Sequence, residues 1–204
     1  METLKKVIIS IIAINFVALG ASLFLRSGLG GDSITLLLEG LHEYFELSYG
    51  LIGILYNGFF IILAIIVNRK SLGIGSFLYA ITCGYFLDFY MIIIGSVISA
   101  NSLIGSFIFI LVGNASICLG FAILISMDSG MSGLDGVLYY IEEKYNISYK
   151  ICKTVIDVIF CIVGMLLGGV FGIGSIFAML TGGTIISYIT RFIKKEKSTK
   201  YLQI

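Results

Sequence analysis

Long apolar runs separated by short polar or glycine-rich segments dominate this 204-residue chain. A bilayer core about 30 Å thick is crossed by roughly 20 apolar residues at a rise of about 1.5 Å each. Runs of about this length are Val7–Leu25, Tyr49–Val67, Ser76–Ile98, Leu103–Ser126, Ile151–Val170 and Ile176–Ile193. Unpaired backbone groups in hydrocarbon cost several kcal/mol each, and the alternation of an outer-membrane strand is absent. The pattern therefore predicts six membrane-spanning helices.

Two shorter segments, Ser33–Leu47 and Leu134–Ile147, carry a different pattern. Apolar residues recur in each at helical spacing along one stripe, and acidic residues lie largely off that stripe. These segments are too short and too polar to cross lipid alone. They are predicted to lie in the membrane interface or to enter the bilayer part-way.

The chain contains the same pattern twice, about one hundred residues apart. Both copies run from Leu-Gly through a glycine-rich turn to an Asp, and similar short motifs follow at matching distances. The paired motifs are Leu47–Tyr49 with Ile147–Tyr149, and Gly73–Ser76 with Gly172–Ser175. We therefore predict two internal repeats, 7–98 and 103–193, each with three spanning helices and one short helix.

The basic residues favour six spanning helices with both termini in the cytoplasm. With six, all basic residues except Arg26 fall on the inner side, as the positive-inside rule requires. If the short segments also crossed, giving eight, the loop with Arg69 and Lys70 would move outside. Three spanning helices per copy place the second copy in the opposite orientation, which is an inverted-topology repeat, whereas four would make the repeats parallel.

Composition narrows the class of protein. The chain is 58% hydrophobic and 12% charged, about half the roughly 25% charge of a soluble domain, so lipid is its main surroundings. A net charge of +1 argues against nucleic-acid binding. We expect one membrane domain over 1–204 with a basic cytoplasmic tail at 194–204. With one His and no Cys-x-x-Cys pair, we expect no metal, no cofactor and no enzymatic activity.

Polar residues inside apolar runs are the candidates for a substrate or ion path, because intramembrane charge is costly. Asp157 lies in the fifth run, and the repeat offset places Asn57 at the equivalent position of the second. Asp88 lies in the third run, and its repeat partner is Ser187. Each of these residues either lines a path or forms hydrogen bonds that hold the helices together, and the sequence leaves both interpretations open.

Asp32 and Asp135 complete the candidate set. Each follows a glycine-rich turn at the start of a short segment. An N-cap Asp accepts a hydrogen bond from an otherwise unpaired N–H group, so helix capping explains both residues. The alternative is that both helix ends point into a central cavity, as in transporters with broken helices.

Several motifs together resemble one family. The run Leu19–Asp32, the Ser48–Gly50 and Gly73–Ser76 motifs, and the Gly84-x-x-x-Asp88 helix are similar to the YczE/YyaS/YitT-like bacterial membrane proteins. This resemblance covers nearly the whole chain. It implies an integral protein of the bacterial inner membrane whose biochemical role is poorly defined.

The inverted repeat and the intramembrane polar residues favour a small permease that moves an unidentified solute by alternating access. The alternative is a membrane scaffold or regulator that does not transport and binds a protein partner through its short helices and tail. Besides the lipid bilayer, a second copy of the chain or another protein is a possible partner.

Overall fold

The computed structural model describes residues 2–97, 103–127 and 132–201, and the regular secondary structure of these segments is helical. The repeated turn therefore lies partly outside the described residues, from Asp128 to Met131. The helices are α1 Glu2–Ser27, α2 Ser33–Phe45, α3 Tyr49–Asn68, α4 Ile74–Val97, α5 Leu103–Ser126, α6 Gly133–Tyr145, α7 Tyr149–Leu166 and α8 Ile173–Tyr201, with a 3-10 turn, η1 Arg69–Ser71, after α3. The predicted all-α class is confirmed.

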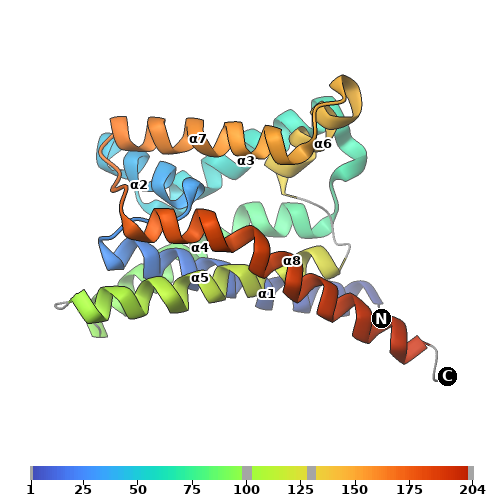
Figure 1. Ribbon diagram of the computed structural model, residues 1–204, viewed down its shortest axis with the longest axis horizontal. Coiled ribbons are helices and arrows are strands. Elements are labelled where there is room, and N and C mark those ends of the chain that lie inside the picture. The colour runs from blue at the N-terminus through green and yellow to red at the C-terminus, as the bar shows by residue number, and fades with distance from the viewer. Residues whose placement is uncertain (1, 98–102, 128–131, 202–204) are drawn as a thin grey trace.

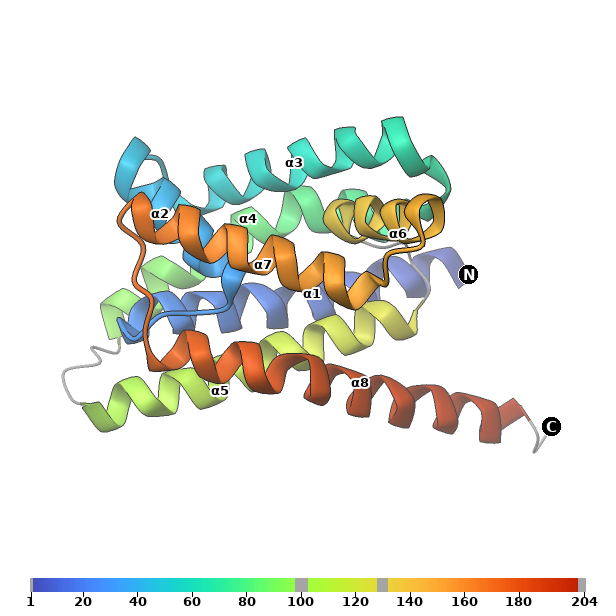
Figure 2. The ribbon, with the colours of Figure 1, turned by 45° about the horizontal axis from the view of Figure 1, so that its top comes forward.

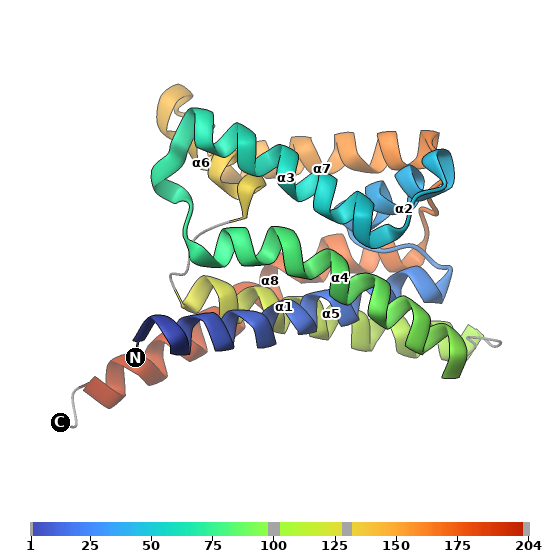
Figure 3. The same cartoon turned by 180° about the vertical axis from the view of Figure 1, so that it is seen from behind.

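The long helices run side by side along one axis of the molecule (Figures 1 and 2). α1 and α5 pack against each other, with α4 beside α1 and α8 beside α5. The short helices α2 and α6 lie at opposite ends of the bundle, which is also clear from behind (Figure 3). Both termini lie at the end that holds α6 (Figure 2).

Among the described residues, five helices are long and apolar enough to cross a membrane: Leu4–Ser27, Tyr49–Ser71, Ile74–Gly95, Leu103–Ser126 and Ile173–Ile193. The predicted sixth, Ile151–Val170, differs. α7, with 18 residues, is long enough, but its three charged residues, Lys150, Lys153 and Asp157, set it apart from the other five. The helix ends before Gly168, whose φ of +104° is a left-handed conformation that favours glycine.

The C-terminal helix also differs from its predicted extent. α8 continues to Tyr201, so the basic segment predicted as a separate tail at 194–204 prolongs the helix through its described part. The last three residues of that segment lie outside the described residues.

The short helices have nearly the predicted bounds, and each packs against a long helix of the opposite half of the chain. α2 packs on α7, and α6 packs on α3. Their apolar stripes meet in one core, in which Leu37 of α2 lies with Leu138 of α6 and Phe160 of α7. Gly40 lets α2 approach α7 closely, since a Cβ there would collide with the carbonyl of Gly164. Both helices end in a left-handed residue, Glu46 and Asn146.

The helix pairs α3–α4 and α7–α8 differ in how closely they pack. α3 packs along α4, where Gly50 and Gly84 bring the two backbones together so closely that neither position has room for a Cβ. α7 and α8, by contrast, barely touch among the described residues. A cavity lies between them.

Candidate functional site

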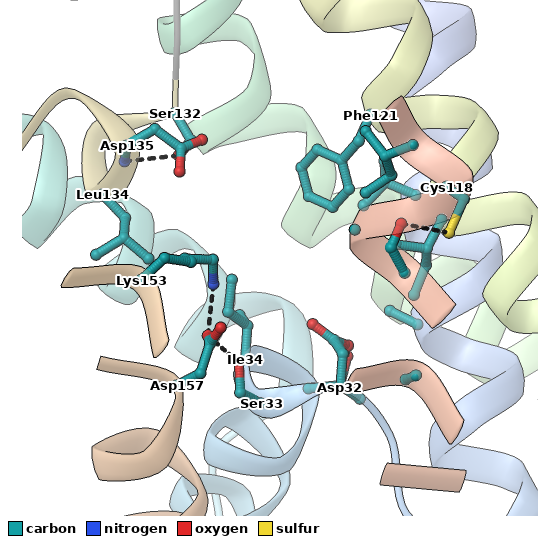
Figure 4. Close-up of a pocket in the computed structure, with 18 of the residues that line it drawn as sticks. Asp32, Ser33, Ile34, Cys118, Phe121, Ser132, Leu134, Asp135, Lys153 and Asp157 are labelled. Atoms are coloured by element: carbon teal, nitrogen blue, oxygen red, sulfur yellow. Dashed lines mark hydrogen bonds and ion pairs between the residues drawn. The ribbon is translucent and has the colours of Figure 1, made fainter. Parts of the chain in front are cut away.

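A cavity of about 1120 Å³ lies inside the bundle and is lined by all eight α-helices, together with Asp32 and Ser132, which precede α2 and α6. α2, α6 and α7 form one wall, and α5 and α8 face them (Figure 4). The lining is mostly apolar, with polar groups concentrated at the starts of α2 and α6 and along α7. Four of the five residues predicted from the sequence line it: Asn57, Asp157, Asp32 and Asp135.

Asp157 is the centre of an ion pair on α7. Lys153 Nζ lies 2.5 Å from Asp157 Oδ1, and Ser33 Oγ of α2 donates to the same oxygen at 2.5 Å. Both charged side chains are mainly buried, with 30% and 21% of their surfaces exposed. Ser33 and Asp157 are 124 residues apart in the chain. Only the packing of α2 on α7 brings them together.

Asp32 holds the N-cap position of α2, as predicted, but its side chain makes no capping hydrogen bond. Its Oδ1 accepts a hydrogen bond from the Thr35 hydroxyl instead. The side chain points into the cavity (Figure 4). Burial raises the pKa of the Asp32 carboxyl, while the Thr35 hydroxyl and the Lys153 ammonium oppose that rise.

The prediction that Asp135 caps α6 is wrong. Ser132 is the N-cap, and its Oγ accepts from the backbone N–H of Asp135 at 3.1 Å. Asp135 is the third residue of the helix, and its carboxylate accepts from Ser132 Oγ (2.8 Å) and from Tyr149 Oη (2.7 Å). The reason is local: the helix starts two residues earlier than Asp135, and Ser132 has the hydroxyl that an N-cap requires.

The pairs at the two helix starts mirror each other. Asp32 with Thr35, and Ser132 with Asp135, each join an N-cap residue to the residue three positions on. In the first pair the N-cap residue carries the carboxylate, and in the second pair it carries the hydroxyl. Each short helix therefore brings one carboxylate to the cavity.

Asn57 and Asp88 differ in their placement. Asn57 lines the cavity and donates to Gly53 O of its own helix at 2.8 Å. Asp88 lies outside the cavity lining, in the contact between α3 and α4. It accepts hydrogen bonds from Ser48 Oγ and from the backbone N–H of Gly50, both at 2.7 Å. Asp88 thus caps α3 from a neighbouring helix.

Among the lining residues that sequence reasoning missed are Lys153, Ser33 and Tyr149. Lys153 could have been found, because a Lys and an Asp four residues apart in an apolar helix form a pair on one face. The sequence gave no such indication for Ser33 and Tyr149, because the partner of each lies in another helix.

The lining combines a few polar side chains with a largely apolar wall. Within the described ranges no group of three or more His, Cys, Asp or Glu side chains could hold a metal ion. The carboxylates face hydroxyl groups and one ammonium, and the rest of the wall is apolar and aromatic. Such a lining can hold a small molecule by a few fixed polar contacts within an apolar enclosure.

Comparison with known proteins identifies the family. Residues 4–191 match the family described as "Family of unknown function (DUF6198)". The chain belongs to this family. It is 25% identical over 201 residues to an uncharacterized protein of Haemophilus influenzae, covering 97% of this chain and 88% of that one. It is also 24% identical over 189 residues to the uncharacterized protein YyaS of Bacillus subtilis, covering 93% and 94%.

These relatives confirm the resemblance to YyaS-like proteins. Both are described as uncharacterized, so neither indicates an activity. No solved structure matches the chain.

Proposed function

We propose that this protein is a small-solute permease of the bacterial cell membrane that works by alternating access through the cavity. The observation that carries the proposal is the cavity itself: acids, an ammonium and hydroxyl groups gather inside a bundle of apolar helices. A charged side chain at membrane depth costs about 3 kcal/mol on insertion scales, so such a group is usually functional.

The helix arrangement supports an inverted repeat with α1–α4 related to α5–α8. α1 and α5 run in opposite directions, as do α3 and α7 (Figure 2). The contact of α1 with α4 has its counterpart in that of α5 with α8, and the contact of α2 with α7 has its counterpart in that of α6 with α3. Transporters built this way bind their solute where the repeats meet and move one part against the other.

The difference between the halves supports a gate. In the first half, Gly50, Gly84 and Asp88 close α3 against α4. The repeat correspondence pairs these residues with Lys150, Gly183 and Ser187, and all three of these line the cavity. One gate is therefore closed and its counterpart open, which is the asymmetry that alternating access requires. In the other state of the cycle α7 would close on α8 and α3 would leave α4.

The orientation follows from the positive-inside rule, with both termini in the cytoplasm. In this orientation α6 lies at the cytoplasmic end, and the open gate between α7 and α8 faces the cytoplasm. Single cysteines placed in α2 and α6 of a Cys-free variant should react with a membrane-impermeant maleimide from opposite sides. Labelling of both from one side would contradict the inverted repeat.

Flux in proteoliposomes tests the transport proposal. Uptake of a panel of radiolabelled small amines, carboxylates, zwitterions and sugars is measured for the full chain and for Asp157→Asn and Lys153→Met. We expect at least one solute to enter faster than into empty vesicles, with about tenfold slower uptake in the variants, the loss expected of a charge-assisted contact. Glu143→Gln, an exposed acid of α6 outside the cavity lining, is the matched control.

Absence of flux for every solute, with a cellular phenotype that vanishes when residues 194–204 are deleted, would contradict transport. That result would favour the scaffold or regulatory role.

A further inference from the structure

We propose that the cavity selects small solutes that carry a protonated amine, with Asp32 as the counter-ion and the Tyr56 hydroxyl as a second contact. This inference rests on the proposed permease function and assigns the substrate class of the same cavity.

Asp32 is the cavity acid that has neither a cation paired with it nor a hydroxyl group on each of its two oxygens. Asp157 is paired with Lys153, and Asp135 accepts hydrogen bonds from two hydroxyl groups, one to each oxygen. Within the described part of the chain, Asp32 has the Thr35 hydroxyl on one oxygen and no ion-pair partner. Its carboxylate points into the cavity (Figure 4). A buried carboxylate placed in this way can accept a charge-assisted hydrogen bond from a ligand.

Tyr56 gives an independent sign of a ligand. It lines the same cavity from α3, and its hydroxyl oxygen is buried without a hydrogen-bond partner among the described residues. Buried hydroxyl groups in folded proteins almost always have a partner, because leaving one unpaired is costly. Tyr56 packs in the same apolar cluster as Ile34 of α2, which follows Asp32 by two residues in the chain.

The walls and the remaining charges favour a cation. Tyr56, Tyr79 and Phe121 line the cavity, and the face of an aromatic ring attracts an ammonium group. An anion would need an unpaired cation inside. Lys153 is already neutralised by Asp157, while Lys150 and Arg191 are exposed at the rim. Their position at the cytoplasmic ends of α7 and α8 is explained by the positive-inside rule.

Binding of three matched probes to the purified full chain in detergent tests the proposal. Phenethylammonium, 2-phenylethanol and phenylacetate share a phenyl ring and differ in charge, and isothermal titration calorimetry gives their affinities. We expect phenethylammonium to bind at least about tenfold more tightly than the other two, the difference that a charge-assisted contact gives.

Two variants locate the contact. Asp32→Asn should weaken phenethylammonium binding by about tenfold or more, and Tyr56→Phe by about threefold to tenfold, as expected for a charged and a neutral hydrogen bond. The matched controls are Glu143→Gln and Tyr85→Phe, an acid and a tyrosine outside the cavity lining. Circular dichroism and gel filtration confirm that each variant folds.

The outcomes separate this inference from the proposed function. Tightest binding of phenylacetate, equal binding of all three probes, or unchanged amine affinity in Asp32→Asn would each overturn the amine assignment. Flux of an anionic or neutral solute that is unaffected by Asp32→Asn would also overturn it, while leaving the permease proposal intact. Amine binding lost in Asp32→Asn, together with absence of flux for every solute, would support the amine site and contradict transport.

Discussion

Asp88 of α4 accepts a hydrogen bond from the backbone N–H of Gly50 in the first turn of α3, with Oδ1 and N 2.7 Å apart. The carboxylate thereby satisfies one of the unpaired N–H groups at the start of α3 and ties the two helices together. Ser187 and Lys150, which the predicted repeat places at the equivalent positions, line the cavity instead. Asp88 is thus present in the closed pair, α3 and α4, and an acid is missing at the compared position of the open pair, α7 and α8.

Replacing Asp88 with Ala should loosen the closed pair. The change leaves the exposed Ser48 hydroxyl and the buried Gly50 N–H without their acceptor, and leaving a buried group unpaired costs about 1–3 kcal/mol. We expect a lower free energy of unfolding by about that amount in detergent, measured by circular dichroism. Ser48→Ala, which removes one of the two contacts, should cost less. Equal stability of Asp88→Ala and the wild type would show that the bond is not formed in the ground state.

If α3–α4 is the closed gate and α7–α8 the open one, residues at the two helix pairs should differ in their access to water. Thr154 lines the cavity, whereas Ile54, its counterpart one hundred residues earlier, packs against Gly84 in the closed contact. In a Cys-free background, Thr154→Cys should react with a water-soluble thiol reagent about tenfold faster or more than Ile54→Cys, because thiolate attack requires access. Equal rates would contradict the asymmetry between the halves. A solute that reverses the order would show the second state of the cycle.

The Lys153–Asp157 pair gives a double-mutant cycle. Lys153→Met leaves a mainly buried carboxylate without its cation. A fully buried pair loses about 3–5 kcal/mol on such a change, and the partial exposure of both side chains reduces our expectation to about 2 kcal/mol. Lys153→Met with Asp157→Leu should recover most of that loss, because an apolar pair avoids the burial of charge. Additive losses in chemical unfolding would show that the two residues do not interact.

Stability should depend on pH through Asp32. Burial raises the pKa of its carboxyl in the folded protein above the ordinary value of about 3.9. The folded state therefore binds the proton more tightly than the unfolded state does. This contribution to stability is present below the ordinary pKa and is lost as pH rises through the raised pKa. Asp32→Asn should remove this part of the pH dependence of the melting temperature, and an unchanged profile would contradict it.

The affinity for phenethylammonium should also depend on the protonation of Asp32, but it should increase with pH, whereas this contribution to stability decreases. A protonated Asp32 cannot pair with an ammonium, so affinity should rise as pH rises through the Asp32 pKa and then level off. The other titratable groups that interact with Asp32 are Lys153, Asp157, Tyr56, Tyr79, Cys118 and Cys161. Asp157→Asn with the same pH profile would assign the proton to Asp32, and a profile lost only in Asp157→Asn would assign it elsewhere.

Local pattern alone determined which segments are helical and which are apolar. A run such as Leu103–Ser126 must form a helix in lipid whatever it packs against, and the predicted bounds of that run agree with α5. The stripe that includes Leu37 and Leu38 likewise predicted the buried face of α2. Asp157 and Asn57 could be found in the same way, because a polar residue at membrane depth stands out in sequence. Asp32 and Asp135 were predicted from the glycine-rich turns that precede them at the starts of the short helices.

Only the tertiary structure decided what those residues contact. Asp88 and Asp157 look alike in sequence, yet one seals α3 against α4 and the other faces an open cavity, because their surroundings come from helices far away in the chain. Ser33 reaches Asp157 only through the packing of α2 on α7. The end of α7 at Leu166 coincides with the left-handed Gly168. The gap between α7 and α8 reflects how little these two helices touch among the described residues. Helix formation depends on neighbours in sequence, whereas the cavity depends on which helix faces meet.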